Sequence, residues 1–254
     1  MSIYVPATYQ ETGGAKAMAE ELIQSVEKIT TDHPDKFEVA YNVADAERIV
    51  SEGKIALPMG MENGAPLEGD LSNVKYFHER GISYITLTHS EDNDICDSSY
   101  NLGERTHKGL SEFGAEVVKE MNKVGIMIDI SHVSDDAFYQ IMDVTEVPAI
   151  ASHSSARHFT PGFERNMSDD MIKRLAENGG VIQINFGSSF VTQESKDKRT
   201  ANGEKISQYA EENNLESDDP KLQEFAKQVA EDNPVFCDVT DVADHIDRVV
   251  ELAG

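Results

Sequence analysis

The stretch GIMIDISHVSDDAFYQIMDVTEVPAIASHSS, residues 125–155, contains the pattern that decides the fold. Two short apolar runs, 126–130 and 148–151, are each followed by a Ser-His pair, which places histidines at His132 and His153. The segment between them is predicted to be a helix, because its opening Ser-Asp-Asp is typical of a helix N-terminus. The stretch therefore predicts two neighbouring parallel strands, each with a histidine at its carboxyl end. In an α/β barrel that end carries the chemistry.

The same unit, a helix that stops at glycine and is followed by a buried strand, recurs along the chain. Such alternation is typical of a parallel sheet with crossover helices. The expected strands cover residues 2–5, 54–59, 82–88, 126–130, 148–151 and 181–186. Six strands at these intervals favour an α/β fold of the (β/α)8 TIM-barrel type, and a flavodoxin-like open sheet is the alternative.

The whole chain, residues 1–254, is predicted to be a single incomplete barrel domain. Residues from about 193 to 233 break the pattern, because charged and amide side chains dominate there. We expect a polar insertion at this point, either a helical flap over the site or a solvated excursion without a catalytic part. A strand begins directly after Met1, and no strand follows the helix expected at 239–252. The first and last barrel strands are therefore expected to be missing, as in a fragment of a longer enzyme.

Composition excludes several classes of function. The chain has a net charge of −25, from 22 basic and 47 acidic residues, so its surface repels nucleic-acid phosphates and anionic lipid. No apolar run approaches the roughly 20 residues that a membrane-spanning helix needs. The first ten residues lack the pattern of a secretory signal, so the localisation stays open, with the cytoplasm slightly favoured. Cys96 and Cys237 are too few for a disulfide framework and are expected to be thiols.

Four polar residues fall at the ends of the predicted strands: Glu62, His89, His132 and His153. A carboxylate and two imidazoles form a common zinc set that leaves positions open for water or substrate. Zinc bound in this way makes water more acidic and polarises a carbonyl group. Each residue alone has an ordinary alternative, either a helix-capping carboxylate or a hydrogen-bonded barrel histidine. Their shared position at strand ends favours a metal site.

Six motifs, spread over nearly the whole chain, carry a resemblance to a known family. They are GMENG (60–64), YITLTHSEDND (84–94), GLSEFGAEVVKEMNKVGIMIDISHVS (109–134), ASHSSAR (151–157), RNMSDD (165–170) and VADHIDRVVELAG (242–254). With these motifs the chain resembles the membrane (renal) dipeptidase family of zinc peptidases. The resemblance implies a (β/α)8 barrel of the metal-dependent hydrolase kind, two zinc ions in the full-length family site and a dipeptide substrate, and it leaves a homodimer open.

The resemblance also implies roles for individual residues. Glu62 resembles the carboxylate that bridges the two zinc ions, and His132 and His153 resemble the ligands of the second ion. His89 resembles the histidine that contacts the substrate near the scissile carbonyl, a catalytic role of the oxyanion type. Arg165 resembles the arginine that binds the C-terminal carboxylate of the dipeptide, a task that suits a guanidinium fork.

Two family motifs have no counterpart in the chain: the His-x-Asp pair that holds the first zinc, and the Gly-x-x-Asp-Phe-Asp-Gly segment that assists proton transfer. The letters of His33-Pro34-Asp35 match the pair but lie in a polar loop. We therefore expect at most one well-formed zinc site and little or no dipeptidase activity from this chain alone. The alternatives are a non-catalytic remnant or binding scaffold of the same fold, and an amidohydrolase-like enzyme acting on a cyclic amide. The latter needs a carboxylated lysine at a strand end, whereas Lys54 opens its strand.

Overall fold

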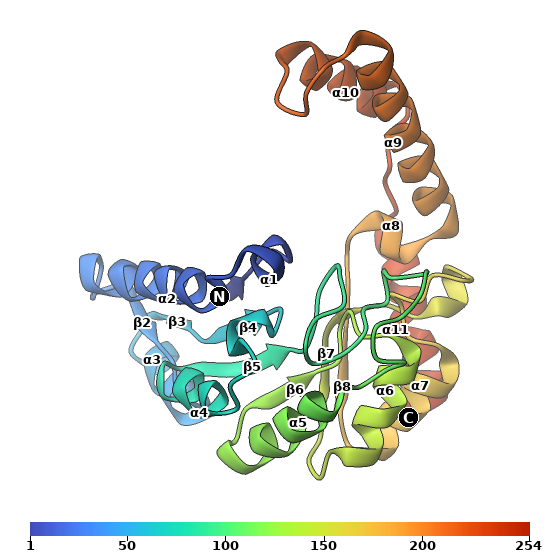
Figure 1. Cartoon of the computed structure of the whole chain (residues 1–254). Coiled ribbons are helices and arrows are strands. Elements are labelled where there is room, and N and C mark those ends of the chain that lie inside the picture. Colours follow the sequence, from blue (N-terminus) through green and yellow to red (C-terminus); the bar gives the residue numbers. More distant parts are fainter. The chain divides into compact units, whose positions relative to one another are not determined.

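The main sheet is the feature that positions the site. In the computed structural model, which describes residues Met1 to Gly254, six strands follow one another in the order β1-β4-β5-β6-β7-β8, and this row is open (Figure 1). The strands are β1 (Ser2–Tyr4), β4 (Met59–Glu62), β5 (Ile82–Thr86), β6 (Met127–Asp129), β7 (Ile150–Ser154) and β8 (Val181–Ile184). Parallel pairing joins β1 to β4, β4 to β5, β5 to β6 and β6 to β7. The predicted parallel α/β sheet is confirmed.

One predicted strand is two separate strands in the structure. Residues 54–59 do not form a single strand, because β3 (Ile55–Leu57) pairs with β2 (Phe37–Val39) in a separate two-stranded sheet. Pro58, which has no N–H to donate to a sheet ladder, separates β3 from β4. As a result β4 begins at Met59 and ends at Glu62. Glu62, the predicted metal ligand, is therefore the last residue of a strand of the main sheet and does not lie in the loop after it.

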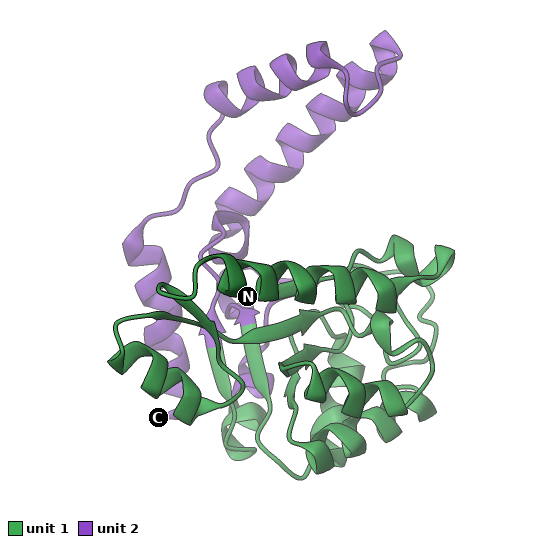
Figure 2. Cartoon of the chain, turned by 90° about the vertical axis from the view of Figure 1, so that its left-hand side faces the viewer, with its two compact units in different colours: residues 1–152, 173–182 green, residues 153–172, 183–254 purple.

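Contact density divides the chain into two compact units (Figure 2). Unit 1 consists of residues 1–152 and 173–182, and unit 2 of residues 153–172 and 183–254. The helices of unit 1 are α1 (Thr8–Thr12), α2 (Ala15–Asp32), α3 (Val43–Ser51), the 3-10 helix η1 (Ala65–Leu67), α4 (Ser72–Glu79), α5 (Glu112–Val124) and α6 (Asp135–Val144). Helix α7 (Asp169–Glu177) crosses the boundary between the units, as do β7 and β8.

Local sequence signals explain where the helices of unit 1 begin and end. Ser111 and Ser134 are the N-caps of α5 and α6, and each side chain accepts the backbone N–H three residues later. Gly125 ends α5 with a φ of 92°, a left-handed backbone that glycine adopts without steric cost. Between these ends, α5 buries Val117, Val118 and Met121 in the core of unit 1. Gly125 therefore separates the end of α5 from β6, which begins at Met127.

Unit 2 is mostly helical. It contains the 3-10 helix η2 (Arg157–Phe159) and the helices α8 (Ser188–Val191), α9 (Gln193–Asn213), α10 (Pro220–Asp232) and α11 (Val239–Ala253). Residues 193–233, predicted as a polar insertion, form α9 and α10, which are joined by stacked rings of Tyr209 and Phe225 with centroids 3.9 Å apart. No helix of the chain has both the length and the apolar character required to cross a membrane.

Candidate metal centre

Three of the predicted site residues come together at one edge of the sheet in unit 1. Glu62 is the last residue of β4, His89 lies three residues after the end of β5, and His132 three residues after the end of β6. The Nε2 atom of His89 is 3.5 Å from Oε1 of Glu62, and the Nε2 atom of His132 is 3.6 Å from the same oxygen. The side chains meet because adjacent parallel strands have their carboxyl ends at the same edge.

The distances in this cluster fit a single bound cation. One potential ligand atom from each of Glu62, His89 and His132 lies within 4.8 Å of the other two. Zinc lies about 2.0–2.2 Å from nitrogen and oxygen ligands, so two ligand atoms at a tetrahedral zinc are about 3.4 Å apart. The two measured distances from Glu62 are close to this value. A carboxylate oxygen and imidazole nitrogens are also ligand types that zinc binds well, so the residues present fit a divalent metal.

Aromatic rings flank the two histidines of the cluster. The ring centroids of His89 and His132 are 4.2 Å apart, and Tyr4 lies 4.8 Å from His89 on one side. The ring of Tyr100 lies 5.9 Å from His132 on the other. Burial raises the pKa of Tyr4, and the negative charge of Glu62 raises it further. The ring contacts restrict how far either imidazole can rotate, and the raised pKa of Tyr4 favours its neutral form next to the Glu62 carboxylate.

The backbone of His132 has an unusual conformation. Its φ is 72°, in the left-handed region that non-glycine residues rarely adopt. This conformation costs about 1–2 kcal/mol, and it persists only where the surroundings hold it. One such contact is the Ser99 backbone N–H, which donates to the His132 carbonyl at 2.8 Å. Strain of this kind at the tip of a central strand is typical of functional sites.

His89 is held by the loop that follows it. The Ser98 hydroxyl donates to the His89 carbonyl at 2.6 Å, and the Ser98 N–H donates to Asp92 at 2.7 Å. The Nδ1 atom of His89 is buried and has no hydrogen-bond partner. Buried polar atoms nearly always have a partner, so the missing one favours a role for His89 in contacting a bound molecule.

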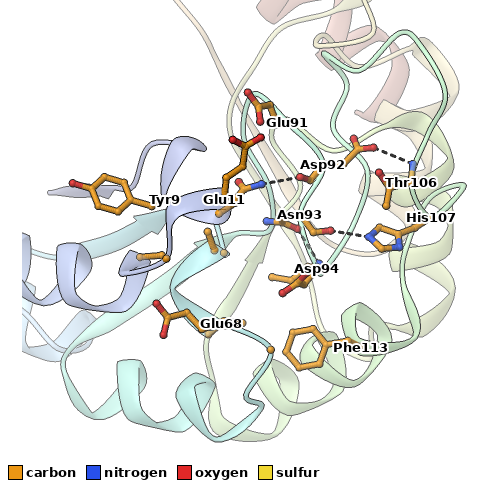
Figure 3. Close-up of a pocket in the computed structure, with 18 of the residues that line it drawn as sticks. Tyr9, Glu11, Glu68, Glu91, Asp92, Asn93, Asp94, Thr106, His107 and Phe113 are labelled. Carbon is orange, nitrogen blue, oxygen red and sulfur yellow. Dashed lines mark hydrogen bonds between the residues drawn. The ribbon is translucent and has the colours of Figure 1, made fainter.

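The same loop borders a cavity of about 560 Å³ in unit 1 (Figure 3). Its lining includes five carboxylates, those of Glu11, Glu68, Glu91, Asp92 and Asp94. Hydrogen bonds fix its wall, because Asp92 accepts the Thr106 N–H at 3.1 Å and the Asn93 carbonyl lies 2.8 Å from His107 Nε2. None of the three clustered residues lines this cavity. The cavity is therefore separate from the candidate metal centre, although its wall continues into the loop that holds His89.

Two further features near the cluster were not singled out from the sequence. Asp129, the last residue of β6, is completely buried and hydrogen-bonded to its neighbours. The sequence signal that could have identified Asp129 is a carboxylate inside an apolar run, because such a group needs hydrogen-bond partners when it is buried. Tyr84 lies across the backbone of Gly60, where a Cβ atom would come 2.0 Å from the ring. Burial, together with the charges of Asp129 and Glu62, raises the pKa of Tyr84 to about 12.

The remaining predicted site residues, His153 and Arg165, belong to unit 2. His153 is the fourth residue of β7. Arg165 is only 3% exposed, and its guanidinium donates to the His153 carbonyl at 2.7 Å and to the Ser154 hydroxyl at 2.9 Å. The guanidinium carbon lies 5.6 Å from the centroid of the Phe190 ring. Arg165 is thus a buried cation anchored to the strand that carries His153.

A parallel α/β sheet with a carboxylate and imidazoles at the carboxyl ends of its strands defines a class, the metal-dependent hydrolases with a TIM-barrel-like fold. Within that class, the family model of the membrane dipeptidases, peptidase family M19, matches residues 1–254. The chain therefore belongs to the membrane dipeptidase family, as the motifs predicted.

Similar curated proteins are dipeptidases by name. The chain is 40% identical over 151 residues to an uncharacterized dipeptidase of Schizosaccharomyces pombe, and the aligned region covers 59% of this chain and 36% of that protein. It is 38% identical over 164 residues to the dipeptidase tcpJ of Claviceps purpurea, and the aligned region covers 65% of this chain and 38% of that protein. The matched part of the chain thus spans less than half the length of these relatives.

Solved structures share the fold. A probable dipeptidase from Pseudomonas aeruginosa has a TM-score of 0.78 at 24% identity, with 98% of this chain and 67% of that chain covered. A metallo peptidase from Rhodobacter sphaeroides, liganded with a phosphinate mimic of the dipeptide L-Ala-D-Ala, has a TM-score of 0.76 at 20% identity, with coverages of 100% and 69%. These likenesses confirm the predicted barrel class, while the sheet of this chain is an open row.

Proposed function

We propose that this chain provides the metal-binding part of a zinc-dependent dipeptidase. The observation that carries the proposal is the convergence of Glu62, His89 and His132 at the ends of three adjacent strands. The Nε2 atoms of His89 and His132 lie 3.5 and 3.6 Å from Oε1 of Glu62. Membership of the membrane dipeptidase family supports the same reaction, the hydrolysis of the peptide bond in a dipeptide.

In this proposal Glu62, His132 and His153 hold the metal. When bound, the zinc acts as a Lewis acid on the peptide carbonyl and makes water a better nucleophile. His89 faces the same carboxylate as His132, and its imidazole donates a hydrogen bond to the oxygen of the scissile carbonyl as negative charge develops there. The alternative ligand set is Glu62, His89 and His132. The two sets differ in which histidine, His89 or His153, is needed for metal affinity.

Arg165 is assigned to the C-terminal carboxylate of the dipeptide. Its guanidinium is nearly fully buried and hydrogen-bonded to the backbone of the strand with His153. A guanidinium is always charged and presents planar donors that match a carboxylate. A cation fixed in this way recognises a free C-terminus, and restriction of cleavage to dipeptides requires that the free N-terminal amine be recognised as well.

Zinc titration of the purified chain tests the metal centre. The wild type is expected to bind about one zinc ion, and E62Q and H132A are expected to weaken binding at least about a hundredfold, because each removes a ligand. H33A is the matched control, since His33 lies at the end of α2 and is exposed. Comparison of H89A with H153A identifies the third ligand. Wild-type binding no tighter than that of E62Q would refute the metal centre.

Binding of a dipeptide analogue tests the substrate class. A phosphinate mimic of a dipeptide is expected to bind the zinc-loaded chain and to lose affinity in R165A, because the buried cation no longer meets its carboxylate. The zinc affinity of R165A should stay at the wild-type level. Release of free amino acids from dipeptides, followed by chromatography, measures turnover in the same samples. If R165A binds the mimic as tightly as the wild type, the assignment of Arg165 is wrong.

A further inference from the structure

Asp129 connects three adjacent strands through one carboxylate. The residue is 0% exposed at the end of β6. Its Oδ1 atom accepts the backbone N–H of Ser131 at 3.0 Å and that of Ser152 at 2.9 Å. Its Oδ2 atom accepts the hydroxyl of Thr86 at 2.6 Å and that of Ser152 at 2.5 Å. Thr86 ends β5 and Ser152 lies in β7, so the side chain bonds to the strand on each side of its own.

Two of the three residues that bond to this carboxylate come directly before the two predicted metal-binding histidines. Ser131 precedes His132 and Ser152 precedes His153. We propose that Asp129 is a positioning residue, whose carboxylate anchors the backbone before both histidines and so holds their imidazoles ready for the metal. The inference rests on the proposed function for the metal, whereas the hydrogen bonds themselves do not depend on it.

The chemistry of the site explains why this residue is an aspartate. An ionised carboxylate only accepts hydrogen bonds and has about four lone-pair positions, which matches the two N–H and two O–H donors around Asp129. Hydrogen bonds to a charged acceptor are also the stronger and shorter ones. An asparagine would direct its NH2 group at two hydroxyls or two N–H groups. The hydroxyls could rotate to accept it, so D129N keeps the shape of the site while it loses the charge.

The conformation of His132 gives a reason for the anchor. Its left-handed φ of 72° follows directly after Ser131, the residue whose N–H Asp129 holds. An unfavourable backbone conformation persists only where neighbouring contacts determine it. Without the carboxylate, the turn between β6 and His132 can relax to a more ordinary conformation, and relaxation there moves the imidazole away from Glu62.

A merely structural role for Asp129 predicts something different, and Asn178 provides the matched control. Its side chain does the same task at the other end of β7: Oδ1 accepts the Ala149 N–H at 2.8 Å, and Nδ2 donates to the Val147 carbonyl at 3.1 Å. N178A removes two hydrogen bonds to the backbone at the start of the strand but none next to a histidine. A role in stability alone predicts that D129A and N178A behave alike.

The first measurement uses the metal-free chain. Amide hydrogen exchange at Ser131 and Ser152 is expected to become at least about tenfold faster in D129A, because both N–H groups lose their acceptor. The NMR signals of the His132 and His153 rings are expected to shift in D129A and to stay in place in N178A. If D129A does not fold, D129N is measured instead, and smaller changes at the same positions are expected.

The second measurement is zinc affinity. Residues that orient metal ligands typically change affinity about ten- to a hundredfold, and we expect a loss of this size in D129A, with N178A within about twofold of the wild type. Equal losses in D129A and N178A would overturn the inference, as would folded D129A or D129N with unchanged exchange at Ser131 and Ser152. If the wild type binds no zinc but D129A still alters exchange and the histidine signals, the proposed function fails while the anchoring by Asp129 stands.

Discussion

Replacing Gly114 by alanine tests how closely the segment after His89 packs against α5. Gly114 is the third residue of this helix, and a Cβ atom there would lie 2.1 Å from the carbonyl oxygen of Ile95 and 2.7 Å from Leu110 Cδ1. The Ile95 carbonyl cannot move freely, because it accepts the N–H of Ser111, the N-cap of the helix, at 3.0 Å. The substitution therefore forces backbone apart at a point where both partners are held.

The size of the effect follows from these contacts. Overpacking of a buried position costs about 1–3 kcal/mol, and a buried N–H that loses its acceptor costs about 1–3 kcal/mol more. Alanine regains about 1 kcal/mol in helix propensity. We expect G114A to lower the free energy of unfolding by about 3 kcal/mol. For a chain of this length each kcal/mol changes the melting temperature by about 2–4 °C, so the expected decrease is about 6–12 °C.

Urea unfolding followed by far-UV circular dichroism measures this free energy, and Gly203 provides the matched control. Gly203 also lies inside a helix, α9, but nothing comes within 4 Å of the position of its Cβ atom. G203A is expected to raise stability by about 0.5–1 kcal/mol, because alanine loses less conformational entropy on folding. If G114A proves as stable as G203A, the close contact between α5 and Ile95 does not exist as described.

Three further predictions concern metal, pH and a buried tyrosine. Zinc at about a hundred times its dissociation constant should stabilise the chain by about 2.7 kcal/mol. The melting temperature should therefore rise when zinc is added and fall again when a chelator removes it. A similar rise in E62Q would count against the metal centre. Burial lowers the pKa of His245, whose Nδ1 accepts the Ala156 N–H at 2.9 Å and whose Nε2 lies 2.8 Å from the Val191 carbonyl. The folded state then binds fewer protons than the unfolded chain, so the contribution of His245 to the free energy of unfolding should be fully present above the ordinary pKa of 6.5 and should decrease as the pH falls below it. In urea unfolding, H245N should therefore lose less stability than the wild type between pH 7.5 and 5.5. An equal loss in the two proteins would contradict this. With a pKa of about 12, Tyr84 should remain neutral at pH 10.5, whereas exposed tyrosines are largely ionised there. The pH titration of its ring signal in NMR spectra, assigned with Y84F, measures this. A titration midpoint near pH 10 would show that the ring is not buried against Gly60.

Much of the fold could be predicted from the sequence because its signals are local. The Ser-Asp-Asp sequence that opens α6 and the glycine that ends α5 act only on nearby backbone groups, so signals of this kind can be recognised in the sequence. The sequence placed Glu62, His89, His132 and His153 at strand ends and predicted Glu62, His132 and His153 as the metal ligands, whereas the cluster in the structure consists of Glu62, His89 and His132. Parallel strands end at one edge, and polar residues that follow apolar runs must therefore lie near one another there.

The tertiary structure decided what depends on partners far away in the sequence. Whether residues 54–62 form one strand or two depends on β2, which withdraws β3 into its own small sheet before β4 begins. The environment of Asp129 depends on Thr86 and Ser152, which are 43 and 23 residues away, and its carboxylate could not be assigned partners from spacing alone. The sequence by itself determined the helix caps and the alternation of helices with buried strands, because those signals come from neighbouring residues. Only the tertiary structure decided which ends touch and which buried charge holds them, because strand pairing and side-chain packing join residues that the chain order keeps apart.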